Sequence, residues 1–125
     1  MKKVIVAILM LALIVTAGLL EHNYIEKTFE ELDEKLNKIE DAIHSESDTA
    51  LSLTNDLTEW WESKRKVMEL FTFSPDLRAF SVALAEQKGS LECGDFNNAL
   101  SKCASLKSMS KNLHNVLDFN IEDII

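Results

Sequence analysis

The sequence predicts an all-α fold, in which an N-terminal transmembrane helix continues into the first helix of an antiparallel up-down four-helix bundle. Three observations predict it. Val4–Leu20 is a run of 17 uncharged, almost wholly apolar residues, and the later segments repeat apolar residues at steps of three and four. One proline and three glycines in 125 residues are too few turn formers for a many-stranded sheet. The predicted division is an anchor at 1–20 and a helical bundle at 21–125.

The charges around the apolar run predict how it lies in a membrane. Lys2 and Lys3 precede the run and Glu21 follows it. A secretory signal also begins with basic residues, but its apolar stretch is about 7 to 15 residues, whereas about 17 can span a bilayer. The positive-inside rule places the N-terminus in the cytoplasm and the bundle outside the cell membrane. We therefore expect a single-pass anchor that stays attached.

A cleaved signal is the alternative interpretation of the same run. The segment "VTA" at 15–17 has the small-x-small pattern of a signal-peptidase site, and cleavage there leaves a secreted helical domain that begins at Gly18.

The first helix of the bundle is predicted to continue directly from the span. Nothing between Leu20 and Ile25 breaks a helix, and the apolar residues then recur with heptad-like spacing. The core-facing positions predicted for this helix are Ile25, Phe29, Leu32, Leu36, Ile39 and Ile43.

The second helix is predicted to start after the polar break "HSESD", with Ser47 or Asp48 as its cap. Its predicted core-facing positions are Ala50, Leu53, Leu57, Trp60, Val67 and Phe71, with Lys64 at the one slot that lacks an apolar residue. Trp61 then points about 100° away from Trp60. It is either half covered by a neighbouring helix or part of a partner surface.

The third and fourth helices have clear start signals. Ser74 as cap, Pro75 at the first helical position and Asp76 in the first turn begin the third helix, and Gly89 is its predicted C-cap. Asp95 is the predicted cap of the fourth helix. The core-facing positions predicted for these helices are Leu77, Phe80 and Leu84, then Phe96, Ala99, Cys103, Leu106, Met109, Leu113 and Val116. Together the four helices are expected to bury Leu36, Leu57, Trp60, Phe80 and Leu106 against one another.

The charge distribution supports this order of helices and limits the class of partner. Residues 21–46 carry nine acids and three lysines, whereas 96–117 carry three lysines and no acid. In an up-down bundle these two helices are neighbours, so their charges attract. The whole chain has a net charge of −8, and the part after the apolar run is more negative still. Nucleic acid and bare anionic lipid are therefore excluded as expected partners.

The sequence shows no pattern of catalytic residues. His22, His44 and His114 lack metal-ligand spacing, and no phosphate-binding loop, nucleophile elbow or paired-carboxylate motif is present. We therefore expect no enzyme activity, no metal and no cofactor. Two arrangements of the cysteines remain open: a Cys93–Cys103 disulfide, or a core Cys103 with a free Cys93.

Several segments resemble a known family. The chain starts "MKK", joins span to bundle through "GLLEHNYIEK", continues with "ELDEKLNKIEDAI" and "LTEWWESKRK", and ends "FNIEDII". In these features it resembles a family of small single-span membrane proteins of spore-forming Gram-positive bacteria, known as domain of unknown function 4363. The resemblance implies an anchored helical domain and implies no chemistry.

The up-down order returns two apolar segments to the bilayer: the turn that contains Phe71 and Phe73, and the C-terminal tail. The predicted contacts with the membrane interface or a partner are Trp61, Phe73, Phe119, Ile121, Ile124 and Ile125. Only three residues precede the span, which are too few to form a cytoplasmic domain. We therefore expect any signal to pass laterally, through another membrane protein. The leading hypothesis is an accessory or interaction module that contacts an integral membrane protein. The alternatives are a ligand-sensing bundle and a spacer or self-associating coiled coil.

Overall fold

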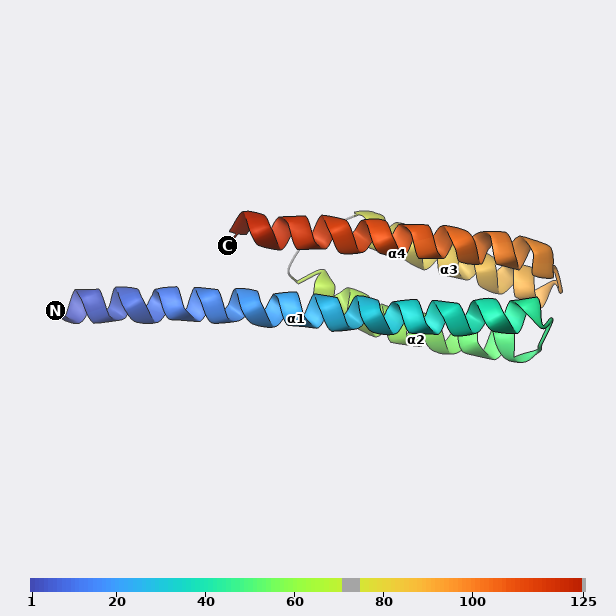
Figure 1. The fold of residues 1–125 in the computed structure, drawn as a ribbon, viewed down its shortest axis with the longest axis horizontal. Helices are drawn as coiled ribbons and strands as arrows, with labels where there is room; N and C mark the ends of the chain where they lie inside the picture. The colour runs from blue at the N-terminus through green and yellow to red at the C-terminus, as the bar shows by residue number, and fades with distance from the viewer. Residues whose placement is uncertain (71–74, 125) are drawn as a thin grey trace.

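The computed structural model contains four helices: α1 (Lys2–His44), α2 (Thr49–Met68), α3 (Pro75–Glu92) and α4 (Phe96–Ile124) (Figure 1). It describes residues 1–70 and 75–124, with the backbone alone for 118–124, and these residues form no strand. The predicted all-α fold, with a long apolar first helix, is confirmed.

The helices follow the up-down order. Each packs against its neighbour in the sequence, and α1 also packs against α4, whereas the described residues of the two diagonal pairs make no close backbone approach. The connections α1–α2 and α3–α4 lie at one end of the bundle, which we call the tip (Figure 1). The opposite end, where α1 emerges from the bundle, we call the base.

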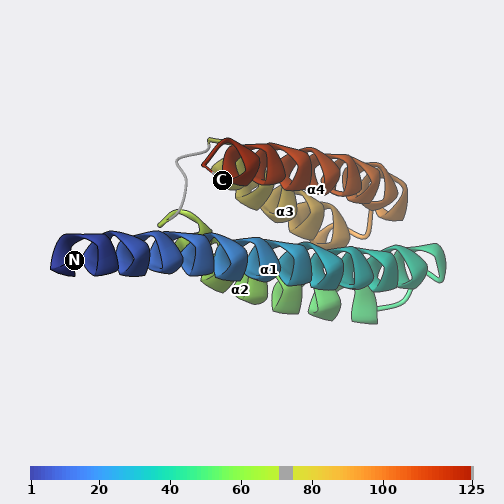
Figure 2. The ribbon, with the colours of Figure 1, turned by 60° about the vertical axis from the view of Figure 1, so that its left-hand side comes forward.

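Helix α1 runs without interruption from the apolar run into the bundle. Its N-terminal half projects beyond the other helices (Figure 2), and its large apolar side chains from Val4 to Leu20 are exposed. Its C-terminal half buries every predicted core-facing residue: Ile25, Phe29, Leu32, Leu36, Ile39 and Ile43. The predicted continuity of the apolar run with the first helix of the bundle is therefore confirmed.

The predicted core face of α2 is confirmed at Ala50 and Leu57 and was wrong by one residue at its other described apolar positions. The buried residues are Ala50, Thr54, Leu57, Trp61 and Met68. Leu53, Trp60 and Val67 are only half buried, and Phe71 lies outside the described residues. The stripe of residues through Thr54 also repeats at steps of three and four. Because Thr54 carries a polar hydroxyl, a pattern based on hydrophobicity does not include it. That hydroxyl donates to the Ala50 carbonyl at 2.9 Å, so it is buried with its hydrogen bond made.

The ends of the helices confirm two predicted caps and correct a third. The Thr49 N–H donates to Ser47 Oγ at 3.2 Å, and the Asn98 N–H donates to Asp95 Oδ1 at 3.1 Å. Helix α3 starts at Pro75 as predicted, while Ser74 lies outside the described residues. It passes through Gly89 and ends at Glu92, so Gly89 is not its C-cap.

Gly94 is the glycine that the turn after α3 requires. Its φ of +74° lies in the left-handed region, which residues with a Cβ rarely adopt. Gly89 has no positive φ, and nothing lies within 4 Å of the position where a Cβ would stand.

Helix α4 buries Ala99, Cys103, Leu106, Ser110, Leu113 and Leu117. Phe96 and Met109 are half buried, and Val116, predicted to face the core, is 40% exposed because the stripe advances four residues from Leu113 to Leu117. Of the five residues expected at the centre, Leu36, Leu57, Phe80 and Leu106 are buried. The fifth is Trp61 instead of Trp60, and the centre of its ring lies 4.5 Å from the centre of the Phe80 ring.

Candidate functional site at the base of the bundle

The contacts between α1 and α4 fix how far α4 reaches along the apolar run. Cys103 Sγ lies 3.7 Å from the Leu36 carbonyl oxygen, and His114 Nε2 lies 2.8 Å from Glu26 Oε1. The two helices are therefore antiparallel, and a residue later in α4 lies beside a residue correspondingly earlier in α1. This register places Asn120 beside Leu20, so the last turn of α4 runs beside the end of the apolar run (Figure 1).

Helix α2 ends closer to the tip than α4 does (Figure 1). Trp60 Nε1 donates to Glu31 Oε2 at 3.2 Å, and Lys64 Nζ lies 5.2 Å from the centre of the Tyr24 ring. These contacts, together with that of Lys35 Nζ with the Trp60 ring at 5.3 Å, place Leu70, in the turn after α2, beside residues 18–25. Its side chain is 81% exposed. The base of the bundle thus carries an exposed leucine at the end of the apolar run.

Large exposed apolar side chains are rare elsewhere on the described bundle. Besides Leu70 they are Val82 and Val116. The register with α1 places Val116 near Tyr24, close to the base. Val82 follows Ser81, which contacts Trp61 in the middle of the bundle. Two of the three therefore lie near the base.

The sequence-predicted interface residues have different outcomes. Trp61 is fully buried and belongs to the core, so its assignment to a partner or membrane surface was wrong. Its indole nitrogen reaches Ser81 on α3, which holds the ring inward. Phe73 and Ile125 lie outside the described residues, as do the side chains of Phe119, Ile121 and Ile124. For these the backbone of α4 shows only that 119, 121 and 124 belong to its last turns.

A cluster of cations and aromatic rings lies on the α1–α2 surface just above the base. Lys64 Nζ is 5.2 Å from the Tyr24 ring centre and 5.9 Å from that of Trp60, while Lys35 Nζ is 5.3 Å from the Trp60 ring. Such contacts contribute about 0.5 to 1 kcal/mol each at exposed sites. Lys64 therefore bridges the two helices at the position where the spacing lacks an apolar residue. The sequence pattern showed that this position lacks an apolar residue, but it did not show that Lys64 contacts two aromatic rings.

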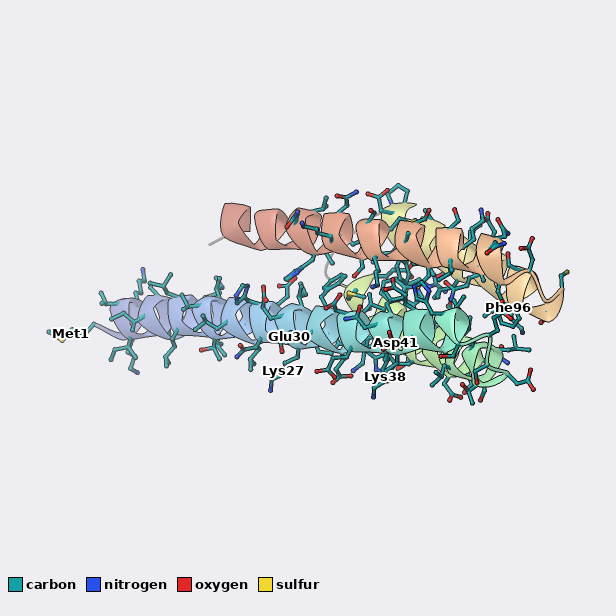
Figure 3. All side chains as sticks on the ribbon, turned by 45° about the vertical axis from the view of Figure 1, so that its right-hand side comes forward. Met1, Lys27, Glu30, Lys38, Asp41 and Phe96 are labelled. Carbon is teal, nitrogen blue, oxygen red and sulfur yellow. The ribbon has the colours of Figure 1, made fainter. Side chains whose placement is uncertain are left out.

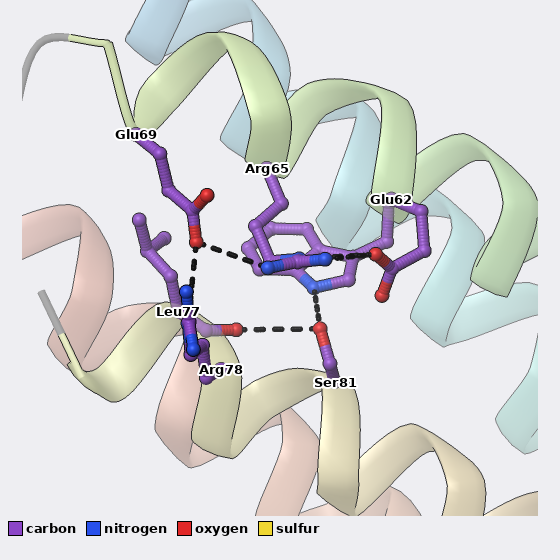
Figure 4. A network of polar contacts seen from close by, with 7 residues as sticks. Glu62, Arg65, Glu69, Leu77, Arg78 and Ser81 are labelled. Atoms are coloured by element: carbon purple, nitrogen blue, oxygen red, sulfur yellow. Dashed lines mark hydrogen bonds and ion pairs between the residues drawn. The ribbon is translucent and has the colours of Figure 1, made fainter.

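A second polar cluster joins α2 to α3 (Figure 4). Arg65 pairs with Glu62 and, at 3.0 Å, with Glu69, whose carboxylate also lies 3.7 Å from Arg78 Nε. Burial acts to raise the pKa of Glu62, but hydrogen bonds from Arg65 and Ser81 and nearby positive charges hold it below its ordinary value. Arg65 is therefore part of a polar network that joins α2 to α3.

The charges of α1 and α4 meet as the sequence predicted. Lys107 Nζ lies 2.7 Å from Glu40 Oε2, and the hydrogen bond that Lys107 donates to this carboxylate raises the pKa of Lys107. His114 contacts Glu26 and stacks on Phe29, with the ring centres 5.0 Å apart. A shallow hollow of about 240 Å³ lies between these helices. Charged side chains also project outward from α1, among them Lys27, Glu30, Lys38 and Asp41 (Figure 3).

A family model for a domain of unknown function, DUF4363, matches residues 19–124. The chain belongs to the DUF4363 family. The match begins at the end of the apolar run and includes the whole described bundle. Neither the curated proteins nor the solved structures gave a significant match.

The two cysteines of this DUF4363 bundle lie in different surroundings. Cys103 is in the core, where burial raises the pKa of its thiol to about 11, and Cys93 is exposed at the tip. Both thiols are free. Within the described residues, no group of three or more His, Cys, Asp and Glu side chains is arranged to hold a metal ion.

Proposed function

We propose that this DUF4363 protein is a membrane-anchored extracytoplasmic accessory module, in which the base of the bundle contacts an integral membrane partner. The observation that carries the proposal is the unbroken helix α1. Its first half is exposed and apolar, with a mean hydropathy of 2.7 over its most apolar stretch. Its second half contributes residues to the core. Because the same helix enters both parts, any tilt or shift of the span moves the bundle.

The charges at the two ends of the apolar run support an extracytoplasmic bundle. Lys2 and Lys3 precede it, and the bundle that follows it is acidic. From Leu20 to the last helical residue of α1, His44, the helix rises about 36 Å at 1.5 Å per residue. A partner embedded in the membrane is therefore within reach of the base and far from the tip.

The base offers a surface for such a partner. The last turn of α4 runs beside the end of the apolar run, and its sequence, "NIEDI", combines isoleucines with two acids. The apolar core favours this interpretation over a ligand-sensing bundle, since 19 of the 24 buried residues are hydrophobic. The use of His114 and Cys103 in packing supports a binding function rather than catalysis.

Anchoring and orientation are tested with the chain's own cysteines. In intact cells, a membrane-impermeant maleimide should label Cys93 at the exposed tip and leave the buried Cys103 unlabelled. The Cys93→Ser variant should lose the label. The protein should also resist alkaline extraction from membranes and keep residues 1–17. A soluble product that begins at Gly18, or labelling of Cys93 only after cell lysis, would overturn this part of the proposal.

The partner is tested by site-specific photocrosslinking in native membranes. A photoreactive residue at Asn23, exposed near the base, should form an adduct with an integral membrane protein. The same residue at Asp48, exposed at the tip, is the matched control and should not. Adducts between two copies of this chain alone would favour self-association, and equal adducts from both positions would contradict a partner at the base.

A further inference from the structure

We propose that the base of the bundle rests on the bilayer surface, with the Leu70 side chain inserted among the lipids as a second contact beside the span. This inference rests on the membrane anchoring proposed above. It adds a defined lipid contact outside the apolar run and fixes which end of each helix faces the membrane.

The turn after α2 directs Leu70 away from the protein. Met68 is fully buried, and Glu69 is held by Arg65 and Arg78. The Leu70 N–H donates to the Val67 carbonyl at 3.1 Å, which continues the last turn of α2. The Leu70 side chain is nevertheless 81% exposed, the highest value among the large apolar side chains of the described bundle. Its neighbours are fixed by contacts within the bundle, while Leu70 projects outward.

The height of Leu70 matches the boundary of the apolar run. The contacts of Lys64 with Tyr24 and of Trp60 with Glu31 and Lys35 set the register that places Leu70 beside residues 18–25. Leu19 and Leu20 in that stretch are themselves exposed. If the run spans the bilayer, Leu70 lies where the hydrocarbon region meets the headgroups. Leu70 thus adds an exposed apolar side chain on α2 close to the end of the exposed apolar run.

Lipid is the occupant that this continuity favours. The large apolar side chains of the run are exposed up to Leu20, so lipid contacts them wherever α4 does not run alongside, and Leu70 lies near the end of the run on a neighbouring helix. The ion pairs of Glu69 with Arg65 and Arg78 lie next to Leu70 in the sequence, which is the pattern of a charged rim above an interfacial apolar residue. Exposed apolar surface rimmed by polar groups marks a membrane or protein contact.

The proposal is tested with an environment-sensitive NBD fluorophore on the full chain in phosphatidylcholine vesicles. The probe is attached to Leu70→Cys in a Cys93→Ser background, where the buried Cys103 does not react. Val82→Cys in the same background is the matched control, because Val82 is also exposed but lies midway along the bundle. The natural Cys93 of the otherwise unchanged chain reports the tip.

The probe at residue 70 should emit at shorter wavelength than at 82 or 93, and brominated lipids should quench it at least twofold more strongly. Equal, water-like emission at residues 70 and 82 in protein that floats with the vesicles would overturn this inference alone. Failure of the protein to float would overturn the anchoring on which it rests. A blue shift in native membranes but not in pure lipid would assign the site to a protein partner and overturn the lipid contact.

Discussion

The indole Nε1–H of Trp61 donates a hydrogen bond of 2.9 Å to Oγ of Ser81, which joins the centre of α2 to α3. The Ser81 hydroxyl lies 3.4 Å from the Leu77 carbonyl, so the contact extends to the α3 backbone (Figure 4). Trp60, the adjacent residue, instead donates to Glu31 on the α1–α2 surface. Two neighbouring tryptophans therefore have different functions in the fold.

Replacement of the two tryptophans by alanine should separate these roles. Trp61→Ala removes a fully buried ring and should cost about 3 to 5 kcal/mol in the free energy of unfolding. Trp60→Ala should cost less than half as much because its ring is partly in solvent. Urea denaturation of the full chain in detergent, followed by circular dichroism, measures both. Equal losses would mean that Trp60 also belongs to the core.

The buried pair Thr54 and Gln87 should show strong coupling. Gln87 Nε2 donates to Thr54 Oγ1 at 3.3 Å, while Gln87 Oε1 has no hydrogen-bond partner among the described residues. Thr54→Val leaves the buried amide unpaired and should cost about 1 to 3 kcal/mol. The double variant Thr54→Val with Gln87→Met removes both polar groups and should recover most of that loss. Additive losses in the double-mutant cycle would contradict a mutually dependent pair.

The two glycines near the end of α3 should respond in opposite directions to alanine. Gly94→Ala places a Cβ on a residue with φ of +74° and should destabilise the protein by about 1 to 2 kcal/mol. Gly89→Ala lies within α3 with open space around it and should stabilise by about 0.5 to 1 kcal/mol. Shifts in the urea midpoint test the pair. A loss of stability on Gly89→Ala would reveal a contact that requires the glycine.

The two cysteines should differ in reactivity and in their effect on alkaline stability. At neutral pH a thiol reagent should modify Cys93 rapidly and Cys103 only after unfolding. Burial raises the pKa of Cys103 from 9.0 to about 11, so the folded state holds the thiol proton more tightly. This contribution to stability is fully present below pH 9 and is lost as the pH rises through about 11.

The variant Cys103→Ala tests this assignment. Its free energy of unfolding should fall less steeply than that of the unchanged chain across the same alkaline range, whatever its stability at neutral pH. Cys93→Ser is the control and should keep the original slope. Identical slopes in all three proteins would show that other groups cause the alkaline loss.

The sequence alone determined the elements and their order. The apolar run, the polar breaks, the caps at Ser47 or Asp48 and at Asp95, and Pro75 at a first helical position predict four helices close to those observed. The core face of α1 was complete because its apolar residues form a single stripe flanked by charges. The opposite charges of the first and last helices also predicted their contact, which Lys107 and Glu40 make.

The tertiary structure decided which of two overlapping stripes faces the core. In α2 and α4, steps of three and of four both fit the helical period, so Trp60 and Trp61, or Val116 and Leu117, are equivalent in the sequence pattern. Partners on other helices settle the choice, since Trp61 can reach Ser81 and Thr54 can reach Gln87. The exposed position of Leu70 beside the end of the apolar run likewise depends on the packing of α2 against α1. Such contacts join residues far apart in the chain, and local periodicity holds no information about them.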